Sequence, residues 1–408
     1  MKFAPNLLNR RLLICEERLK TLNGHFFEWN RAVRAIHEQA GAHVDICCHR
    51  DAIPAVRDGL GAMPHFHDTL PETPMGRNSC ARLAQQITHA TRAYQQSKQA
   101  LKQTGPVDTV LVSTTPDHQL LAWSWLYRRS VGRAFSRLVL FFIMGQARYA
   151  NYDPNPIFLG RARFYRHVLR SFKRGVEDGS VVLCTDSDQT KKEYELLCDL
   201  PFVELPTPRV GTHIIEPRVG KPVTFASLGP PRSEKGAAEL IDAINLVRQM
   251  RLGRPIRFLI QWPGDFTDAN GRHITIPSDW DSDPRIEVVR RFYDSAEYDR
   301  VMQQCDCLLL PYRWSDYFNR ISAVLVETAT AGIPAIVVEN TWLHRAITQY
   351  GAGVTCLDRN PQSLAQAITR VCDNIESLSH SARARSADAV AHHSPERFLH
   401  LLWGDVKC

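Results

Sequence analysis

Short β-rich runs alternate with amphipathic helical segments along most of the 408 residues, and this alternation limits the fold more than any other feature. In the first half the runs include "RRLLICEE", "VDTVLVST" and "SVVLCTDS", and in the second half "PVTFASLG", "IRFLIQWPG", "CDCLLLPY" and "IPAIVVEN". Such alternation is typical of βαβ units, which build parallel sheets covered by helices. Two sets of runs therefore predict an α/β protein with two doubly wound domains.

A stretch rich in Pro and Gly, "LPTPRVGTHIIEPRVGKP", lies between the two sets of runs and predicts a linker. We expect an N-terminal Rossmann-like domain over residues 1–207, a linker over 208–220 and a C-terminal Rossmann-like domain over 221–385. Residues 386–408 are expected to form a C-terminal helix that returns to the N-terminal domain. A chain of this length is long enough to bury two separate cores.

Composition and charge exclude several classes of protein. With 44% hydrophobic and 23% charged residues the chain is globular in composition, and no apolar run approaches the roughly 18 to 20 residues that span a bilayer. Eleven scattered cysteines favour reduced thiols, and the N-terminus has no small-residue cleavage site, so we expect a cytoplasmic protein. The net charge of +7 indicates an anionic partner such as a phosphate ester, an acidic membrane surface or nucleic acid.

The loop after "VTFASLG" carries glycine and cations before a helix begins. It reads "GPPRSEKGAAELIDAI", with Gly229, Arg232 and Lys235. Ligands of doubly wound sheets bind at the carboxyl ends of strands, where backbone amides and cations can neutralise phosphates. The loop is a candidate clamp for a diphosphate, and the alternative is a solvated loop with incidental basic residues.

A second candidate loop opens the stretch "YFNRISAVLVETATAGIPAIV". Ser322 and Ala323 can begin a helix whose first amides face an anion. Glu327 follows within the apolar helix, and its carboxylate can accept hydrogen bonds from two vicinal hydroxyls, as a ribose presents them. The alternative is a glutamate on the wet edge of the helix.

Residues 220–375 resemble the retaining glycosyltransferases of GT-B fold that carry an E-x7-E motif, the group 1 family. The shared order is a strand, "GxxxxxKG", a strand, "aDxxxxPY", and then E-x7-E followed by "GxP". The resemblance implies two Rossmann-like domains facing a central cleft. It implies that Gly229, Arg232 and Lys235, with Gly236, hold the diphosphate of the donor, and that Glu327 binds its ribose. Ser322 and Ala323, at the helix start described above, are expected at the same diphosphate.

The chain departs from the family pattern at the first glutamate, where it has Asn319 followed by Arg320. The family position contacts the hydroxyls of the donor sugar, and an asparagine can still donate and accept hydrogen bonds there. We expect Asn319 at the donor sugar. Arg320 is either a second cation for the phosphates or a surface arginine.

The N-terminal half offers fewer signals. Gly24 and His25 lie in the loop after the first strand, where the resemblance implies a contact with the acceptor or a phosphate; helix-entry packing is the alternative for His25. His118 lies just past a strand, where many relatives carry a histidine against the donor sugar, and the alternative is an exposed histidine beside a capping Asp117. The run "HFHD" at 65–68 lacks partner ligands, so we expect no metal site.

The segment "RARFYRHVLRSFKR" at 161–174 carries an apolar stripe at helical spacing, made of Phe164, Tyr165, Val168, Leu169 and Phe172. Six basic residues surround this stripe. Two interpretations stay open for this stripe. It either packs into the core, or it docks on an anionic membrane surface or a lipid diphosphate.

The combined prediction is a cytoplasmic glycosyltransferase, or one peripheral on the inner face of the membrane, that retains the anomeric configuration. It would move a sugar from a nucleotide-diphosphate donor to a glycan or lipid-linked acceptor in bacterial surface polysaccharide synthesis. We expect the nucleotide of the donor to be UDP or GDP. We expect no cofactor, no metal and no nucleic acid partner, because the basic residues lack an interleaved aromatic platform. A nucleotide-sugar epimerase and a non-catalytic binding protein of the same fold are the alternatives.

Overall fold

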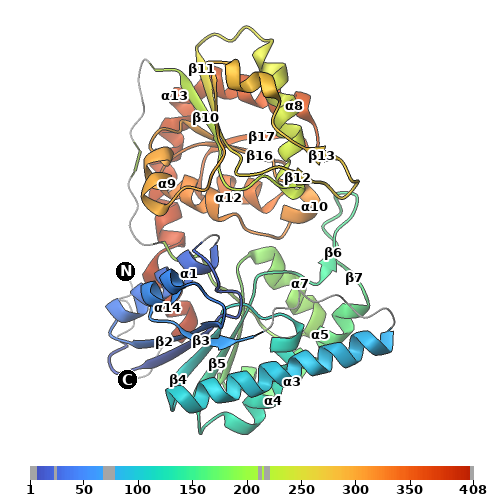
Figure 1. Ribbon diagram of the computed structural model, residues 1–408, viewed down its shortest axis with the longest axis vertical. Coiled ribbons are helices and arrows are strands. Elements are labelled where there is room, and N and C mark those ends of the chain that lie inside the picture. The colour runs from blue at the N-terminus through green and yellow to red at the C-terminus, as the bar shows by residue number, and fades with distance from the viewer. Residues whose placement is uncertain (1–6, 23–24, 68–78, 210–213, 216–220, 405–408) are drawn as a thin grey trace. The chain divides into compact units, whose positions relative to one another are not determined.

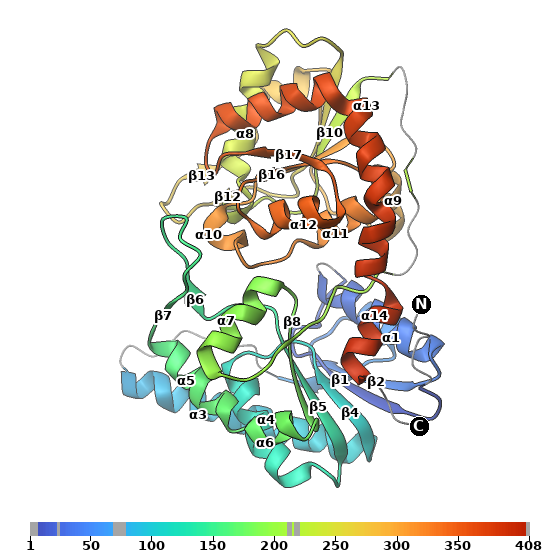
Figure 2. The same cartoon turned by 180° about the vertical axis from the view of Figure 1, so that it is seen from behind.

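The computed structural model describes residues 7–22, 25–67, 79–209, 214–215 and 221–404, without the side chains of residues 25 and 79–83. The chain forms two compact units, which Figures 1 and 2 show from opposite sides. The chain passes from one unit to the other four times. One unit holds residues 1–148, 155–210 and 394–408, and the other holds 149–154 and 211–393. Each unit has its own parallel sheet.

The N-terminal unit is built on a parallel sheet with the order β3-β2-β1-β4-β5-β8-β9. Its strands are β1 (Arg11–Cys15), β2 (His43–His49), β3 (Met63–Phe66), β4 (Val107–Val112), β5 (Phe135–Phe142), β8 (Val181–Thr185) and β9 (Val203–Glu204), and β6 (Ala147–Arg148) pairs antiparallel with β7 (Ile157–Phe158). Its helices are α1 (His25–Gln39), α2 (Pro54–Leu60), α3 (Ser79–Thr104), α4 (Asp117–Ser130), α5 (Gly160–Arg170), α6 (Lys173–Glu177), α7 (Asp188–Cys198) and α14 (Pro395–Trp403).

The C-terminal unit repeats this architecture with the order β14-β11-β10-β15-β16-β17. Its strands are β10 (Val223–Ser227), β11 (Ile256–Gln261), β14 (Ile286–Val289), β15 (Cys307–Leu310), β16 (Ala335–Val338) and β17 (Gly353–Cys356), and β12 (Phe266–Thr267) pairs antiparallel with β13 (His273–Ile274). Its helices are α8 (Ala237–Arg248), α9 (Ser295–Met302), α10 (Trp314–Tyr317), α11 (Ala323–Thr330), α12 (Trp342–Tyr350) and α13 (Pro361–His392), with 3₁₀ turns η2 (Ser233–Lys235) and η3 (Ser278–Ser282).

The strands are short and almost continuously apolar because both faces of each sheet are covered by helices. β15 and β16 are buried at every position, and β5 is buried over its last five residues. In the C-terminal unit one core cluster includes Phe225 and Phe258 with residues of α8 and α13, and a second includes Leu308 with residues of α11 and α12. The two clusters lie on opposite faces of the sheet, as the period of two in a strand requires. The prediction of doubly wound parallel sheets is confirmed.

The apolar stripe of segment 161–174 lies in the core of the N-terminal unit. Tyr165, Val168, Leu169 and Phe172 are at most 5% exposed, and Phe164 packs against the same cluster. The core-packed interpretation of this stripe is confirmed, and docking of the stripe itself on a membrane is wrong, because these side chains already fill the core. Its basic residues face outward; Arg170, for example, forms an ion pair with Asp199.

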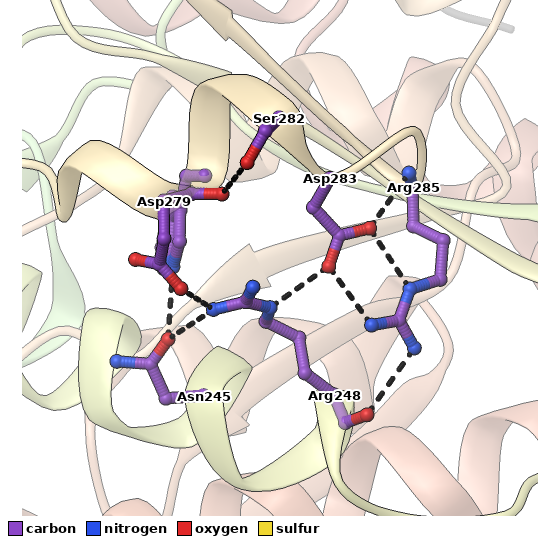
Figure 3. A network of polar contacts seen from close by, with 7 residues as sticks. Asn245, Arg248, Asp279, Ser282, Asp283 and Arg285 are labelled. Atoms are coloured by element: carbon purple, nitrogen blue, oxygen red, sulfur yellow. Dashed lines mark hydrogen bonds and ion pairs between the residues drawn. The ribbon is translucent and has the colours of Figure 1, made fainter.

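An ion-pair network ties α8 to the turn before β14 at the amino-terminal edge of the C-terminal sheet (Figure 3). Arg248, at the end of α8, donates to Asp279 at 2.6 Å and to Asp283 at 2.8 Å. Arg285 holds the other side of the Asp283 carboxylate, at 2.8 and 3.0 Å. The network lies at the edge opposite the carboxyl ends of the strands, so we assign it a structural role.

The nine cysteines whose side chains the structure describes are buried and free, and burial raises the thiol pKa of several of them, for example that of Cys47 to about 12. Within the described ranges no helix combines the length and apolar character needed to cross a membrane.

Candidate functional site

The order of strands in the C-terminal sheet brings two of the predicted loops together. β10 and β15 are direct neighbours, with Phe225 opposite Cys307 and Ala226 opposite Leu308. After β10 the chain continues to β11 on one side, and after β15 it continues to β16 on the other. The loops after β10 and β15 therefore diverge at this point, and doubly wound folds bind their ligands in the crevice that results.

The first loop begins at Gly229, whose position is fixed by a side chain from the neighbouring strand. Its amide donates to the side-chain oxygen of Gln261 at 2.6 Å, and the amide group of Gln261 donates to the carbonyl of Arg291 at 3.1 Å. Gly229 has a φ of 91°, and a Cβ there would lie 3.0 Å from the ammonium nitrogen of Lys235. The backbone conformation therefore favours glycine at this position, and the Lys235 ammonium returns over the loop beside it.

The end of this loop is locked onto the loop after β15. Gly236 has a φ of 68°, and a Cβ on it would come within 2.1 Å of the carbonyl oxygen of Pro311. The amide of Arg313 donates to the carbonyl of Glu234 at 2.9 Å, and its guanidinium pairs with Glu239 at 2.9 Å. The two loops consequently form one rigid edge, and α8 begins directly behind it.

Cations and tyrosine rings gather on this edge. The Lys235 ammonium lies 5.6 Å from the ring centre of Tyr312, Arg320 lies 5.2 Å from that of Tyr317, and the two rings are 4.5 Å apart. Burial, together with the nearby charges of Arg232 and Arg320, lowers the pKa of Lys235 to about 8. A depressed lysine pKa beside two arginines indicates a place where an anion would relieve repulsion.

Helix α11 begins beside this cluster. Ser322 is its N-cap and accepts from the amide of Leu325 at 3.3 Å, and the Ser322 hydroxyl also hydrogen-bonds Tyr312. Ala323 is the first helical residue, so its amide belongs to the first turn, whose donors have no partner within a helix. The N-terminus of α11 thus adds its partial positive charge to that of the cations.

Glu327 lies half-buried on α11, and a neighbouring helix partly satisfies it. The hydroxyl of Tyr298, on α9, donates to Glu327 Oε2 at 2.6 Å. Leu325 and Val326 turn into the core beside it. A carboxylate held in this way is pre-oriented, which a glutamate on a wet helix edge is not. Its charge also lies close enough to Tyr312 to raise the pKa of that phenol, although burial raises it more.

Asn319 and Arg320 belong to the segment 318–322, which has no regular secondary structure and connects α10 to α11. Both side chains are half-buried. Arg320 faces the tyrosines and influences Lys235, so it belongs to the basic edge rather than to a remote surface. Asn319 directly precedes it in the chain.

The histidine predicted to lie at the donor sugar is found inside the N-terminal unit. His118 is 3% exposed, and its Nε2 lies 2.7 Å from Oε2 of Glu17, which also accepts from Gln119 at 2.7 Å. Within the described residues, His118 Nδ1 and Glu17 Oε1 have no hydrogen-bond partner. Asp117 is not a simple helix cap, since it accepts from Arg161 and from Tyr165 at 2.6 Å.

The remaining predicted residues are Gly24 and His25, in the loop predicted to follow the first strand. Gly24 is outside the described residues, and for His25 the structure gives only its backbone as the first residue of the helix. Their expected contact with an acceptor or a phosphate stays a prediction.

Three residues of the basic edge and its surroundings were not singled out in the sequence: Gln261, Tyr298 and Tyr317. Gln261 and Tyr298 contact partners far along the chain, Gly229 and Glu327, whereas Tyr317 contacts Tyr312 and Arg320 nearby. In the N-terminal unit the same holds for Glu17, whose partner His118 is distant in sequence. Only Tyr317 carried a local signal, because it stands two residues before Asn319 in the stretch that suggested the site.

The edge formed by the loops after β10 and β15 can therefore bind an anion that carries a group with several hydroxyls. Arg232, Lys235 and Arg320 supply charge, the N-terminus of α11 supplies amides, and Glu327 supplies an acceptor for hydroxyls. Within the described residues no group of three or more His, Cys, Asp or Glu side chains could hold a metal ion.

Two units, each with a parallel sheet in Rossmann-like order, define the GT-B fold. Within the C-terminal unit, residues 222–374 match the sequence model of the family "Glycosyl transferases group 1". No curated protein sequence matches the chain.

Solved structures are similar over nearly the whole chain, and at these identities the likeness concerns the fold alone. HepE from Anabaena, in complex with UDP, has a TM-score of 0.60 at 11% identity, covering 96% of this chain and 98% of that one. Sucrose-phosphate synthase from Thermosynechococcus elongatus has a TM-score of 0.59 at 14% identity, covering 97% and 98%. A putative UDP-N-acetylglucosamine 2-epimerase from Listeria monocytogenes has a TM-score of 0.55 at 13% identity, covering 95% and 94%.

Proposed function

We propose that the protein is a glycosyltransferase that moves a sugar from a nucleotide-diphosphate donor to a hydroxyl of a glycan or lipid-linked acceptor. The observation that carries this proposal is the basic edge of the C-terminal unit, where Lys235 and Arg320 lie on the neighbouring rings of Tyr312 and Tyr317 and α11, the helix of Glu327, begins three residues after Arg320. The charge of Arg232 is close enough to lower the pKa of Lys235. This arrangement suits a diphosphate joined to a ribose. The matched family and the UDP complexes of HepE support the same donor class.

In this proposal the bond between the anomeric carbon and the diphosphate oxygen breaks, and the bonding pair leaves with the diphosphate. A new bond forms between the anomeric carbon and the acceptor oxygen, whose proton passes to the departing phosphate. The cations and the amides of α11 stabilise the charge that grows on the diphosphate, which is the task a metal performs in other transferases. We propose retention of configuration and no metal, with UDP or GDP as the nucleotide.

Binding of sugar nucleotides tests the donor site directly. Because a ligand stabilises the folded state by mass action, about 2.7 kcal/mol at a hundred times Kd, the donor should raise the melting temperature clearly. We expect one of the UDP-, GDP-, ADP- and CMP-sugars to do so, without added metal and in the presence of EDTA. No shift with any of the four classes would overturn the proposal.

A nucleotide-sugar epimerase is the second candidate, and one observation keeps it in view. Glu16, Glu17 and Asp117 gather at the carboxyl ends of β1 and β4, the switch point of the N-terminal sheet. Glu16 accepts from Ser113 at 2.8 Å and Thr114 at 2.6 Å, and burial raises its pKa. Each of these carboxylates already has internal donors, which favours a structural role.

Incubation of the bound sugar nucleotide in D₂O separates these possibilities. An epimerase that removes and returns a proton on the sugar carbon would incorporate deuterium without any acceptor. A glycosyltransferase would leave the donor carbon unlabelled and release the nucleoside diphosphate when acceptor is added. Binding without either reaction would identify a non-catalytic binding protein.

The acceptor, a role in bacterial surface polysaccharide synthesis and a cytoplasmic or membrane-peripheral location belong to the same proposal. They rest on the resemblance of the donor site to a family with such members and on the net positive charge of the chain. Incubating the protein and its donor with extracted lipid-linked glycans, and following transfer of labelled sugar, tests the acceptor class.

A further inference from the structure

A short hairpin from the N-terminal half of the chain contributes residues to the C-terminal unit. β6 and β7, labelled in Figure 1, pair antiparallel, and the loop residues Tyr149–Pro154 between them group with the C-terminal unit. Two loop residues, Asn151 and Tyr152, have φ values of 54° and 59°. Asparagine tolerates this left-handed region, but a tyrosine rarely occupies it, so the contacts made by the loop must hold it there.

Those contacts form a chain of four aromatic rings. The ring of Tyr149 lies 4.6 Å from that of Phe318, and the ring of Tyr152 lies 5.0 Å from that of Trp314. Trp314 and Phe318 are themselves 5.1 Å apart, at the two ends of α10. The hydroxyl of Tyr152 donates at 3.1 Å to Asp358, whose other oxygen accepts from the amide of Trp314 at 3.3 Å.

Phe318 is the residue directly before Asn319 and Arg320. It is 5% exposed, its carbonyl accepts from Arg345 at 2.7 Å, and the Arg345 guanidinium lies 5.4 Å from its ring centre. Phe318 is thus held by Arg345 of α12 and by Tyr149 of the loop. Residues 318–322 form no helix or strand, so no regular backbone hydrogen-bond pattern fixes Asn319 and Arg320, and the anchoring of Phe318 constrains where they lie.

We propose that Tyr149 is a positioning residue for the donor site, and that it acts by packing on Phe318 and fixing the segment that carries Asn319 and Arg320. This inference rests on the proposed donor site, and it adds a specific role for a loop that is distant in sequence. Tyr149 would govern how the sugar end of the donor is held. The diphosphate would still bind Arg232 and Lys235, because these residues are locked by Gly236 and Gln261.

The test compares Tyr149→Ala with Tyr149→Phe in the full-length chain. Tyr94→Ala serves as the matched control, because Tyr94 is likewise a partly buried tyrosine that packs on another aromatic ring, 6.2 Å from that of Trp125 in the N-terminal unit. Hydrogen exchange of the ligand-free proteins is measured over peptides covering 314–322. Calorimetric titration then compares UDP with UDP-glucose.

We expect Tyr149→Ala to speed exchange over 318–322 at least about fivefold, to leave UDP affinity within about twofold, and to weaken UDP-glucose by about tenfold, or 1.4 kcal/mol. Tyr149→Phe, which keeps the ring, and Tyr94→Ala should match the wild type in all three measurements. Unchanged exchange in Tyr149→Ala, or equal weakening of UDP and UDP-glucose, would overturn the inference. A wild-type protein that binds neither ligand would instead count against UDP as the donor nucleotide, and the exchange result would still decide whether Tyr149 holds the segment.

Discussion

Lys235 is a half-buried cation near two arginines, so keeping it charged in the folded protein costs free energy. Burial is the largest cause of its lowered pKa, followed by Arg232. We expect Lys235→Ala to weaken UDP binding at least tenfold, because a charge-assisted contact to an anion contributes about 1.5 to 3 kcal/mol. Calorimetry measures this affinity. Lys173→Ala, at an exposed lysine paired with Glu177, is the control and should bind as the wild type does.

The pH dependence of Lys235 follows from the direction of its shift. The folded pKa is about 8, against an ordinary value of 10.5, so the unfolded chain binds the extra proton between these values. The free energy of unfolding should therefore rise with pH from about 8 to 10.5 by a contribution that Lys235→Ala lacks. UDP affinity should fall over the same window, because the diphosphate needs the charged amine. An affinity that is flat from pH 7 to 10 would contradict this.

Glu327 offers a second test at the level of one side chain. Glu327→Gln keeps the size and one acceptor, including that for Tyr298, but it loses the charge that strengthens hydrogen bonds from a ribose. We expect nucleotide affinity and kcat/KM to fall together by roughly 1.5 to 3 kcal/mol, with the free energy of unfolding unchanged or higher. Tyr298→Phe should have a smaller effect in the same direction. Unfolding of Glu327→Gln with normal affinity would make the carboxylate structural.

At the scale of elements, the packing of η2 and α8 onto the end of β15 depends on one glycine. An alanine at 236 would combine a φ of 68° with a Cβ 2.1 Å from a backbone oxygen, and backbone cannot move aside cheaply. We expect Gly236→Ala to lower the free energy of unfolding by at least about 2 kcal/mol and to weaken UDP binding. Gly264→Ala is the control, because a Cβ there meets nothing within 4 Å. Denaturant unfolding and titration measure both quantities.

The network that joins α8 to β14 should make part of the stability pH-dependent. Hydrogen bonds from Arg285, and further ones from Arg248, hold the pKa of Asp283 well below its ordinary value of 3.8, and its side chain is 7% exposed. Its contribution is therefore present above about pH 4 and is lost as the pH falls toward the folded pKa. Asp283→Asn should lower the free energy of unfolding by about 1.5 to 3 kcal/mol at pH 7, with the difference from wild type shrinking below pH 4.

The control for Asp283 lies in the same turn. Asp281 pairs with Arg290, and both side chains are more than half exposed, so Asp281→Asn should cost less than about 1 kcal/mol at any pH. Chemical denaturation at pH 7, 5 and 3 gives the comparison. Equal losses in the two variants would mean that burial does not strengthen the Asp283 contacts.

At the scale of the whole molecule, the C-terminal helix α14 is part of the hydrophobic core of the N-terminal unit. Phe398, Leu399, Leu402 and Trp403 of α14 are at most 6% exposed and pack with β1 and β2 residues of the N-terminal unit. Deleting residues 394–408 would expose this cluster, and losing one large core side chain already costs about 2 to 5 kcal/mol. We expect the shortened chain to lose the N-terminal unit's cooperative transition or to aggregate. Calorimetry measures this transition, and an unchanged cooperative transition of the N-terminal unit in the shortened chain would contradict the expectation.

The sequence by itself determined the class of fold and the loops that matter. Short, almost continuously apolar runs that alternate with amphipathic helical segments are a local property of the sequence, so they predict parallel sheets without knowledge of contacts. Gly229, Arg232 and Lys235 follow a strand directly, and Ser322 with Glu327 occupies a recognisable helix start, so the sequence pointed to two candidate loops, which only the family resemblance joined into one group. Docking of the apolar stripe of segment 161–174 on a membrane was wrong, because an amphipathic pattern does not say what its apolar face covers.

Only the tertiary structure decided the partners of these residues. The strand order brings β10 beside β15, and from that neighbourhood follow the locking of Gly236 on Pro311, the rings around Lys235 and the hydrogen bond from Tyr298 to Glu327. The burial of His118 against Glu17, about a hundred residues away, and the packing of Tyr149 on Phe318 arise in the same way. Such contacts join segments whose spacing along the chain carries no periodic signal, because chain folding and not local propensity brings them together.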